Sequence, residues 1–472
     1  MRTILLLCGI ILLSACQKRI NEEPIEENLV EVIDTSFLDS KIVIDKTQPK
    51  TEAKYQENRS MDEQNPAIFL DLTDSTVETL TPDMANHYSQ VRYAKLRHPG
   101  LPRAFFLDNL RAGVLYEIGM TTFHGLYSSI YPTPSGIIAG DLFFGFHYYD
   151  LDGNFKYTIA QTTPLPEYQA WLYVLKVEYD KSRELLTNFS VLGDNCLAVT
   201  ETEKKNDIAF FNIPRQNHYL TRSETKANSR FHLLSPNSYI EYNYIPWEGT
   251  INTFMESFNM YGERLCQFTN YNSRPQEQSE NYQNPEHLLV YHYNGELTIR
   301  QPYNDTIFRM TSPFRLKPEF ITHSGNQKLD VKTALYGDKA GKLIRKTWLE
   351  TNDFVFLSYT ENYDHQGNRD LNAVKYFYRW YDKKSKQLYR IESDHYPEEQ
   401  WIRNSIPEGI PLLTAHTKFV ENRLYTVYNK SQLKTMIEHV SFSKLSINER
   451  QTIKKKYEEL KKDELLIMIL EQ

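Results

Sequence analysis

An aromatic-rich hairpin pattern recurs along most of this chain and limits the folds that it can adopt. In each copy an alternating strand meets a polar turn and a second strand follows, which is the signature of a β-hairpin. Six copies span residues 146–157, 208–220, 258–268, 298–310, 376–391 and 424–436. Their turns lie about forty to eighty residues apart, a period typical of propeller blades with variable loops.

Segments that precede these hairpins supply further strands. Examples are 136–143, 287–292 and 353–359, which are short, largely apolar runs. The aromatic share of 13%, with 33 tyrosines and 24 phenylalanines, also favours strands. A propeller blade has four strands, and stacking around a ring covers both of its faces. We therefore predict an all-β fold, a six-bladed β-propeller over residues 66–440.

The N-terminus indicates export and lipid attachment. Arg2 supplies a positive charge, and Ile4 to Leu13 form an apolar run that is shorter than the roughly 20 residues of a membrane-spanning helix. Leu13-Ser14-Ala15-Cys16 follows and resembles the lipobox of bacterial lipoproteins. We predict a signal peptide over residues 1–15 and lipid attachment at Cys16; an ordinary cleaved signal with an incidental cysteine is the alternative.

Residues 16–65 are predicted to hold the lipidated cysteine and a flexible tether. This segment is rich in Glu, Lys, Gln, Asn and Pro, a composition that buries too little apolar surface to offset the entropy of ordering. Two or three acyl chains would anchor the protein stably to a membrane. The expected location is the outer membrane, with the protein facing the periplasm or the cell surface. The folded part should begin near Pro66, with Ala67 to Leu72 as its first strand.

Taken together, these features resemble a known family. The lipobox, the tether, Tyr149 to Phe155 and above all Gln301 to Arg309 are similar to the six-bladed β-propeller lipoproteins of Gram-negative gut anaerobes. The resemblance covers roughly Pro66 to the C-terminus and implies the fold, while most members are uncharacterised. Thr162 to Tyr168 stands where the commonest subgroup has a Gly-rich segment after its first hairpin.

The C-terminal residues 441–472 break the β pattern. Ser446 and Glu449 have the spacing of a capping box, and both charge signs follow at helical spacing, so a helix is predicted from about Ile447 to Lys461. Leu465 to Leu470 reads as a buried strand. We expect this strand to pair with Ile68 to Leu72 and close the ring, since an open propeller would expose strand edges; the alternative is a partner-binding helix and strand.

Motifs for known chemistry are mostly absent from the sequence. Neither His-Glu-x-x-His nor Gly-x-Ser-x-Gly occurs. Asp150 to Asn154 resembles a calcium loop but lacks the EF-hand positions of Gly and Glu, so a hairpin turn is favoured. His287 and His292 fall on opposite faces of a strand, which favours structural roles. No catalytic residue, metal ligand or cofactor is therefore predicted.

Two cysteines, Cys196 and Cys266, remain in the mature chain once Cys8 is cleaved off and Cys16 is lipidated. An oxidising compartment would permit a disulfide between them. Cysteine is among the most buried residue types when unbridged. We therefore favour two buried thiols over a bridge.

Tryptophans are the remaining candidates for ligand contact. Trp348, Trp380 and Trp401 lie in or near strands and fit the blade core, whereas Pro246 and Gly249 bracket Trp247 in a loop-like setting. Trp247 is therefore the one predicted binding residue.

Charge and motifs together bound the function. The formal charge of −7 becomes −8 without Arg2, and no basic stripe is present, so no nucleic-acid partner is predicted. We expect an envelope-anchored, non-catalytic binding or assembly module whose partner is a glycan, a peptide or an envelope protein. Its channel mouth should then lack convergent titratable groups. The alternatives are a propeller enzyme, either a lyase or a glycoside hydrolase, and a structural accessory of an outer-membrane nutrient-uptake complex with an exposed apolar patch.

Overall fold

A computed structural model gives the fold of most of the chain. It describes residues 66–97, 129–141, 145–160, 185–201, 206–223, 229–243, 253–269, 288–336, 339–361, 375–391, 401–461 and 464–472. All of these residues belong to one compact unit, Leu38–Gln472.

The described strands form six blades, each built on a four-stranded antiparallel sheet. Blade one contains β4 (Ser129–Pro132), β5 (Ile137–Asp141), β6 (Gly145–Tyr149) and β7 (Phe155–Ala160). Blade two contains β8 (Leu185–Leu192), β9 (Asn195–Glu201), β10 (Asn206–Asn212) and β11 (Asn217–Ser223). Blade three contains β12 (Ser229–Ser235), β13 (Ser238–Asn243), β14 (Thr253–Asn259) and β15 (Arg264–Thr269).

The other three blades complete the ring. Blade four contains β16 (Leu289–Tyr293), β17 (Glu296–Arg300), β18 (Thr306–Ser312) and β19 (Arg315–His323). Blade five contains β20 (Ile344–Glu350), β21 (Phe354–Glu361), β22 (Lys375–Asp382) and β23 (Gln387–Ile391). Blade six contains β26 (Thr417–Val420), β27 (Arg423–Asn429), β28 (Glu464–Glu471) and β3 (Gln90–Arg97). The predicted six-bladed propeller is thus confirmed.

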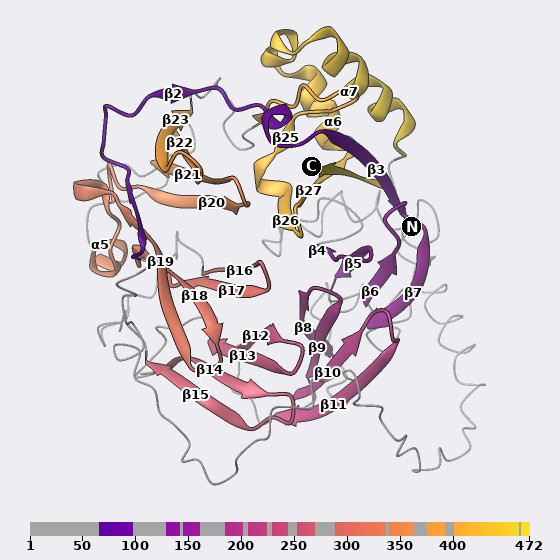
Figure 1. Cartoon of the computed structure of the whole chain (residues 1–472), viewed down its shortest axis with the longest axis vertical. Coiled ribbons are helices and arrows are strands. Elements are labelled where there is room, and N and C mark those ends of the chain that lie inside the picture. The colour runs from indigo at the N-terminus through magenta and orange to yellow at the C-terminus, as the bar shows by residue number, and fades with distance from the viewer. Residues whose placement is uncertain are drawn as a thin grey trace, which may run out of the picture. The chain divides into compact units, whose positions relative to one another are not determined.

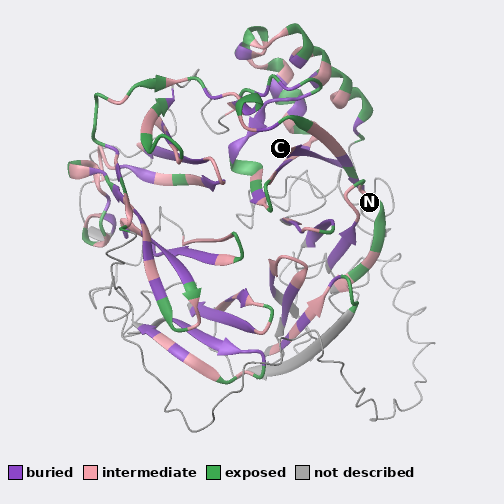
Figure 2. Ribbon diagram, in the orientation of Figure 1, coloured by how far each residue is buried: buried purple, intermediate pink, exposed green. Residues whose placement is uncertain are grey.

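Within each blade the strands run from the centre of the ring outward. The innermost strands are β4, β8, β12, β16, β20 and β26 (Figure 1). Five of the six predicted hairpins, 146–157, 208–220, 258–268, 298–310 and 376–391, coincide with pairs of adjacent antiparallel strands. Strands inside a blade are covered on both faces, and seven of the eight residues of β21 are buried (Figure 2).

Side chains from neighbouring blades pack together around the whole ring. Five buried apolar clusters join blades one and two, three and four, four and five, five and six, and six and one. Blades two and three meet through the rings of Phe210 and Tyr239, whose centroids lie 5.8 Å apart. Each described blade therefore covers an apolar face of the next one.

Blade six is completed by both ends of the described chain. The strand β28 lies between β27 and β3, and its pairing with β3 runs over eight residue pairs from Glu464↔Arg97 to Glu471↔Gln90. The expected closure by Leu465 to Leu470 is confirmed, but the expected partner, Ile68 to Leu72, is wrong. β3 matches the full length of β28, whereas β1 (Ile68–Asp71) has only four residues and pairs elsewhere.

The N-terminal segment runs along the outside of two blades before it closes the ring. β1 adds in parallel to β19 of blade four, and β2 (Thr79–Leu80) adds in parallel to β23 of blade five. The 3₁₀ turn η1 (Met84–Asn86) follows, with Asp83 accepting from the backbone N–H of Ala85. This segment covers two outer strand edges that would otherwise present unpaired backbone groups.

Smaller elements connect and cover the blades. They are η2 (Gly325–Gln327), α5 (Val331–Tyr336), the pair β24 (Trp401–Ile402) and β25 (Leu412–Leu413), η3 (Thr414–His416), α6 (Lys430–Glu438), η4 (Val440–Lys444) and α7 (Ile447–Glu459). The predicted C-terminal helix is α7, with both hydrogen bonds of the Ser446–Glu449 capping box present.

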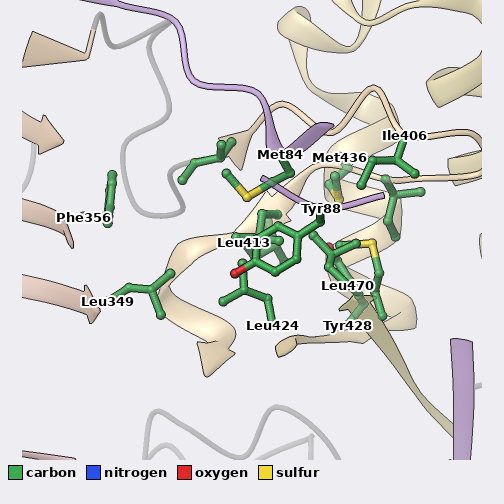
Figure 3. Close-up of a cluster of buried hydrophobic side chains, with 14 of the residues drawn as sticks. Met84, Tyr88, Leu349, Phe356, Ile406, Leu413, Leu424, Tyr428, Met436 and Leu470 are labelled. Atoms are coloured by element: carbon green, nitrogen blue, oxygen red, sulfur yellow. The ribbon is translucent and has the colours of Figure 1, made fainter. Parts of the chain in front are cut away.

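The predicted hairpin at 424–436 is wrong, because β27 leads directly into α6. Asn429 caps this helix. Its side chain accepts a hydrogen bond from the backbone N–H of Gln432, and the side chain of Gln432 accepts one from the backbone N–H of Asn429. Leu433 and Met436 of α6 enter the cluster between blades five and six. Figure 3 shows Met436 in this cluster with side chains of several other segments, among them Tyr88.

Removal of a buried side chain from the closing strand should destabilise the protein. Ile467 lies in β28 and is fully buried in the cluster between blades six and one. Ile467→Ala should lower the free energy of unfolding by about 2–5 kcal/mol, as measured by urea denaturation. The same substitution at Ile447, which is 64% exposed, should change it by less than about 0.5 kcal/mol. Equal effects of the two variants would contradict ring closure through β28.

Candidate functional site

The two site residues predicted from the sequence, Cys16 and Trp247, lie outside the described residues. His287 does too, while His292 donates from Nε2 to the carbonyl oxygen of Leu233 at 2.6 Å, consistent with its predicted structural role. Cys196 and Cys266 are both buried, and no disulfide joins them. The prediction of two buried thiols is therefore confirmed.

The other tryptophans pack within the blades or against the C-terminal segment. Trp380 is buried and stacks on Phe354 at 3.8 Å, and Trp348 donates from Nε1 to the hydroxyl of Tyr291 at 2.7 Å. Trp401 is partly buried with its ring edge-on to His439. None of these three forms an open aromatic platform.

The segment with a calcium-like spacing is a hairpin turn, as predicted. Oδ1 of Asp150 accepts from the backbone N–H groups of Asp152 and Asn154, and Oδ2 pairs with Lys156 at 2.8 Å. Partial burial raises the pKa of Asp150, but the hydrogen bonds from Lys156 and Asn154 outweigh it and bring the pKa to about 2. The carboxylate is thus held by the chain's own groups.

A cavity of about 490 Å³ lies on the axis of the ring. Residues at the ends of four inner strands and in the turns after them line it, together with Pro132 at the end of β4. Its walls include Leu192 of blade two, Leu234 of blade three, His292 of blade four and Glu421 of blade six. Five blades therefore contribute to one cavity, whose volume is typical of small-molecule sites.

A cluster of polar side chains lies on the same inner strands, next to the residues of the cavity wall. The polar side chains are those of Ser190, His232 and Lys418. Like Ile130, each of these residues precedes a residue of the cavity wall by two positions, about 7 Å along a strand. Nζ of Lys418 donates to the carbonyl oxygen of Ile130 at 2.6 Å and lies 4.4 Å from the ring centre of Tyr131. Blade six thus presents a cation to blade one near the axis.

His232 is held by side chains from two blades. Its Nδ1 lies 3.5 Å from the Ser190 hydroxyl and its Nε2 lies 3.2 Å from the Tyr242 hydroxyl. The Ser190 hydroxyl also accepts from the backbone N–H of Leu233 at 3.0 Å. The imidazole is therefore positioned between β8 and β13, and its two nitrogens have near partners.

Burial controls the charges of this cluster. It lowers the pKa of His232 to about 3 and that of His292 to about 4, so both rings are neutral at pH 7. It also lowers the pKa of Lys418 to about 8, which leaves the ammonium mostly protonated at pH 7. The net charge of these three groups is thus positive at pH 7. The expectation of a mouth without convergent titratable groups is wrong, because three such groups from three blades meet here.

A second polar cluster fixes the position of the strands around the cavity. Glu350 at the end of β20 receives two hydrogen bonds from Nη2 of Arg309, at 2.8 and 3.0 Å, and others from Tyr291 at 2.5 Å and Lys383 at 2.9 Å. Burial and the neighbouring Glu350 raise the pKa of Tyr291, so its hydroxyl stays a donor. These contacts join blade four to blade five.

The same cluster reaches the turn of blade six that borders the cavity. Lys383 donates to the hydroxyl of Tyr293 at 3.1 Å, which donates to the side chain of Asn352 at 3.0 Å. Asn352 in turn donates to the side chain of Asn422, the neighbour of Glu421. The Glu350 cluster therefore ties three blades together beside the axial cavity.

Sequence reasoning missed Lys418, His232 and the Glu350 cluster. Lys418 lies in the short strand Thr417–Val420, and a charge in the segment before the predicted hairpin at 424–436 was the available signal. Among the described residues, no group of three or more His, Cys, Asp and Glu side chains is arranged to hold a metal ion. In that same part of the chain no helix is both long and apolar enough to span a membrane.

The fold and the axial cavity define a six-bladed β-propeller with a candidate small-molecule site. The chain belongs to the family of the domain of unknown function DUF4933, whose model matches residues 50–439. No curated protein matches it.

Among solved structures, the chain is similar to a protein from Bacteroides fragilis whose name describes it as a predicted exported protein. The two share 10% identity with a TM-score of 0.50, over 86% of this chain and 98% of that one. The structure of BamB from Moraxella catarrhalis matches at 9% identity with a TM-score of 0.34, over 72% of this chain and 96% of that one. At such identities the first likeness supports the fold alone.

Loss of the Glu350 charge should destabilise the protein strongly. Glu350→Gln leaves the buried Arg309 with only its longer ion pair to Glu319, at 3.7 Å, and we expect the free energy of unfolding to fall by about 3–5 kcal/mol. Glu361→Gln is the matched control, because Glu361 pairs with the exposed Lys375 at 3.1 Å, and it should cost less than about 1 kcal/mol. Chemical denaturation measures both. A loss below about 1 kcal/mol at Glu350 would show that the cluster does not hold the blades.

Proposed function

We propose that this protein is an envelope lipoprotein whose propeller binds a small ligand at the axial cavity. The observation that supports binding most is the convergence of five blades on one cavity of about 490 Å³. Its walls belong to inner strands, which the ring locks in place, and to the turns that follow them. Rigid walls favour recognition because little ordering entropy is lost on binding.

The face that carries the cavity also presents exposed aromatic side chains. In blades one to five the turn after the first strand and the turn after the third strand lie at the same end, because successive strands are antiparallel. Phe155, Tyr261 and Phe314 lie at turns after the third strand and are 43%, 51% and 47% exposed. They surround the cavity face on blades one, three and four, and they offer apolar contact to a larger partner or ligand.

Lipid anchoring at Cys16 is the second part of the proposal. It is supported by the Leu13-Ser14-Ala15-Cys16 motif and by the exported character given in the name of the Bacteroides fragilis protein. Residues 16–65 would then link the anchored cysteine to the propeller. The outer membrane is the proposed location.

An enzyme is the second candidate function, because titratable groups from different blades do converge. Two observations favour binding over catalysis. His232 has near partners at both ring nitrogens, and Glu421 is the one carboxylate among the described residues that line the cavity. A glycoside hydrolase needs a pair of carboxyl groups about 5 to 10 Å apart, which this described lining does not supply.

Lipid attachment can be tested by metabolic labelling. With an alkyne fatty acid supplied to a Gram-negative host, the wild-type chain should become labelled and sediment with the membranes. Cys16→Ser should abolish both labelling and sedimentation, because the acceptor thiol is gone. Cys196→Ser is the control that should keep both. Labelled Cys16→Ser protein would refute attachment at this residue.

Obstruction of the cavity should abolish ligand binding without unfolding the protein. We would screen glycans, peptides, muropeptides and divalent metals by thermal shift, where a ligand at 100 times its Kd adds about 2.7 kcal/mol. Leu192→Trp places a larger ring in the half-buried cavity wall and should remove the shift. Val440→Trp, at a residue that is 77% exposed, should keep it. A shift that survives Leu192→Trp would place the ligand elsewhere.

A further inference from the structure

Lys418 has no acidic partner within the described part of the chain, although it lies near the axis. Its ammonium donates one hydrogen bond, to the carbonyl oxygen of Ile130, and faces the ring of Tyr131. No carboxylate of the described residues lies within ion-pair distance of it. An ammonium carries three N–H groups, so two remain for a ligand.

Among the described residues, none compensates the charge of Lys418. His232 is within electrostatic reach and is neutral at pH 7. The aromatic ring of Tyr131 offers a weak attraction. Lys418 is itself exposed to solvent, so a ligand can reach its ammonium, and the positive charge attracts an anion.

We infer that the axial site recognises a small ligand through a carboxylate group that pairs with the ammonium of Lys418. This inference rests on the proposed binding function and adds the chemical class of the ligand. The uncharged part of the ligand would occupy the cavity beside Leu192, Leu234 and His292. A uronic acid and the terminal carboxylate of a short peptide share this chemistry.

Paired probes distinguish these sources and test the inference. The sugar pair is glucuronate and glucose, and the amino-acid pair is N-acetylalanine and its amide. Calorimetry at pH 7 on the purified protein should give at least tenfold tighter binding for the acid than for its neutral analogue in one pair. Lys418→Met should remove that difference. Lys434→Met, at an exposed lysine of α6, is the matched control and should preserve it.

The dependence on pH gives an independent readout. As the pH rises through the pKa of Lys418, about 8, the free site loses its positive charge. Affinity for the acid should fall about tenfold between pH 7 and pH 9. His232 and His292 remain neutral over this range, and the neutral analogue controls for Tyr131 and Tyr242. Lys418→Met should also retain its folded state, because the change removes an uncompensated charge.

The outcomes separate this inference from the proposed function. If acid and neutral probes bind equally and Leu192→Trp abolishes both, the axial site stands and the role of Lys418 is refuted. If binding persists in Leu192→Trp, the axial site itself is refuted. If no acid probe binds, the assignment of a carboxylate ligand is overturned.

Discussion

A single strand, β28, holds the ring together, because it pairs with β27 on one side and with the distant β3 on the other. Its apolar residues from Leu465 to Leu470 are all buried. Two blade interfaces use them, since alternate side chains enter the clusters with blade five and with blade one. Backbone pairing and apolar burial therefore fix the last blade together.

Ring closure also explains how the axial site acquires its chemistry. Lys418, His232 and His292 come from blades six, three and four, and they are remote in sequence. Closure brings blade six against blade one, where Lys418 meets Ile130 and Tyr131. The Glu350 cluster keeps blades four, five and six in register beside the cavity. Burial in this setting lowers the pKa of all three groups.

Local patterns predicted the fold well, since alternation, turns and caps depend on neighbouring residues. The capping box at Ser446 and five of the hairpins are examples. Two predictions failed. The closing strand pairs with β3 and not with Ile68 to Leu72, because the sequence alone does not choose between distant partners. A helix begins at Asn429 with Gln432 where a hairpin turn was predicted, because two local signals compete there. The site could not be predicted from spacing, because only the ring brings Lys418 near His232.

The charge of Lys418 is best measured by NMR titration of the protein with ¹³C-labelled lysine side chains. Lys418→Arg identifies the resonance. We expect one lysine with a midpoint near pH 8, well below the usual value of about 10.4, and an upward shift of that midpoint when glucuronate or N-acetylalanine binds. If every lysine titrates near its usual value, the surroundings of Lys418 do not disfavour its charge, and its role as an anion site is contradicted.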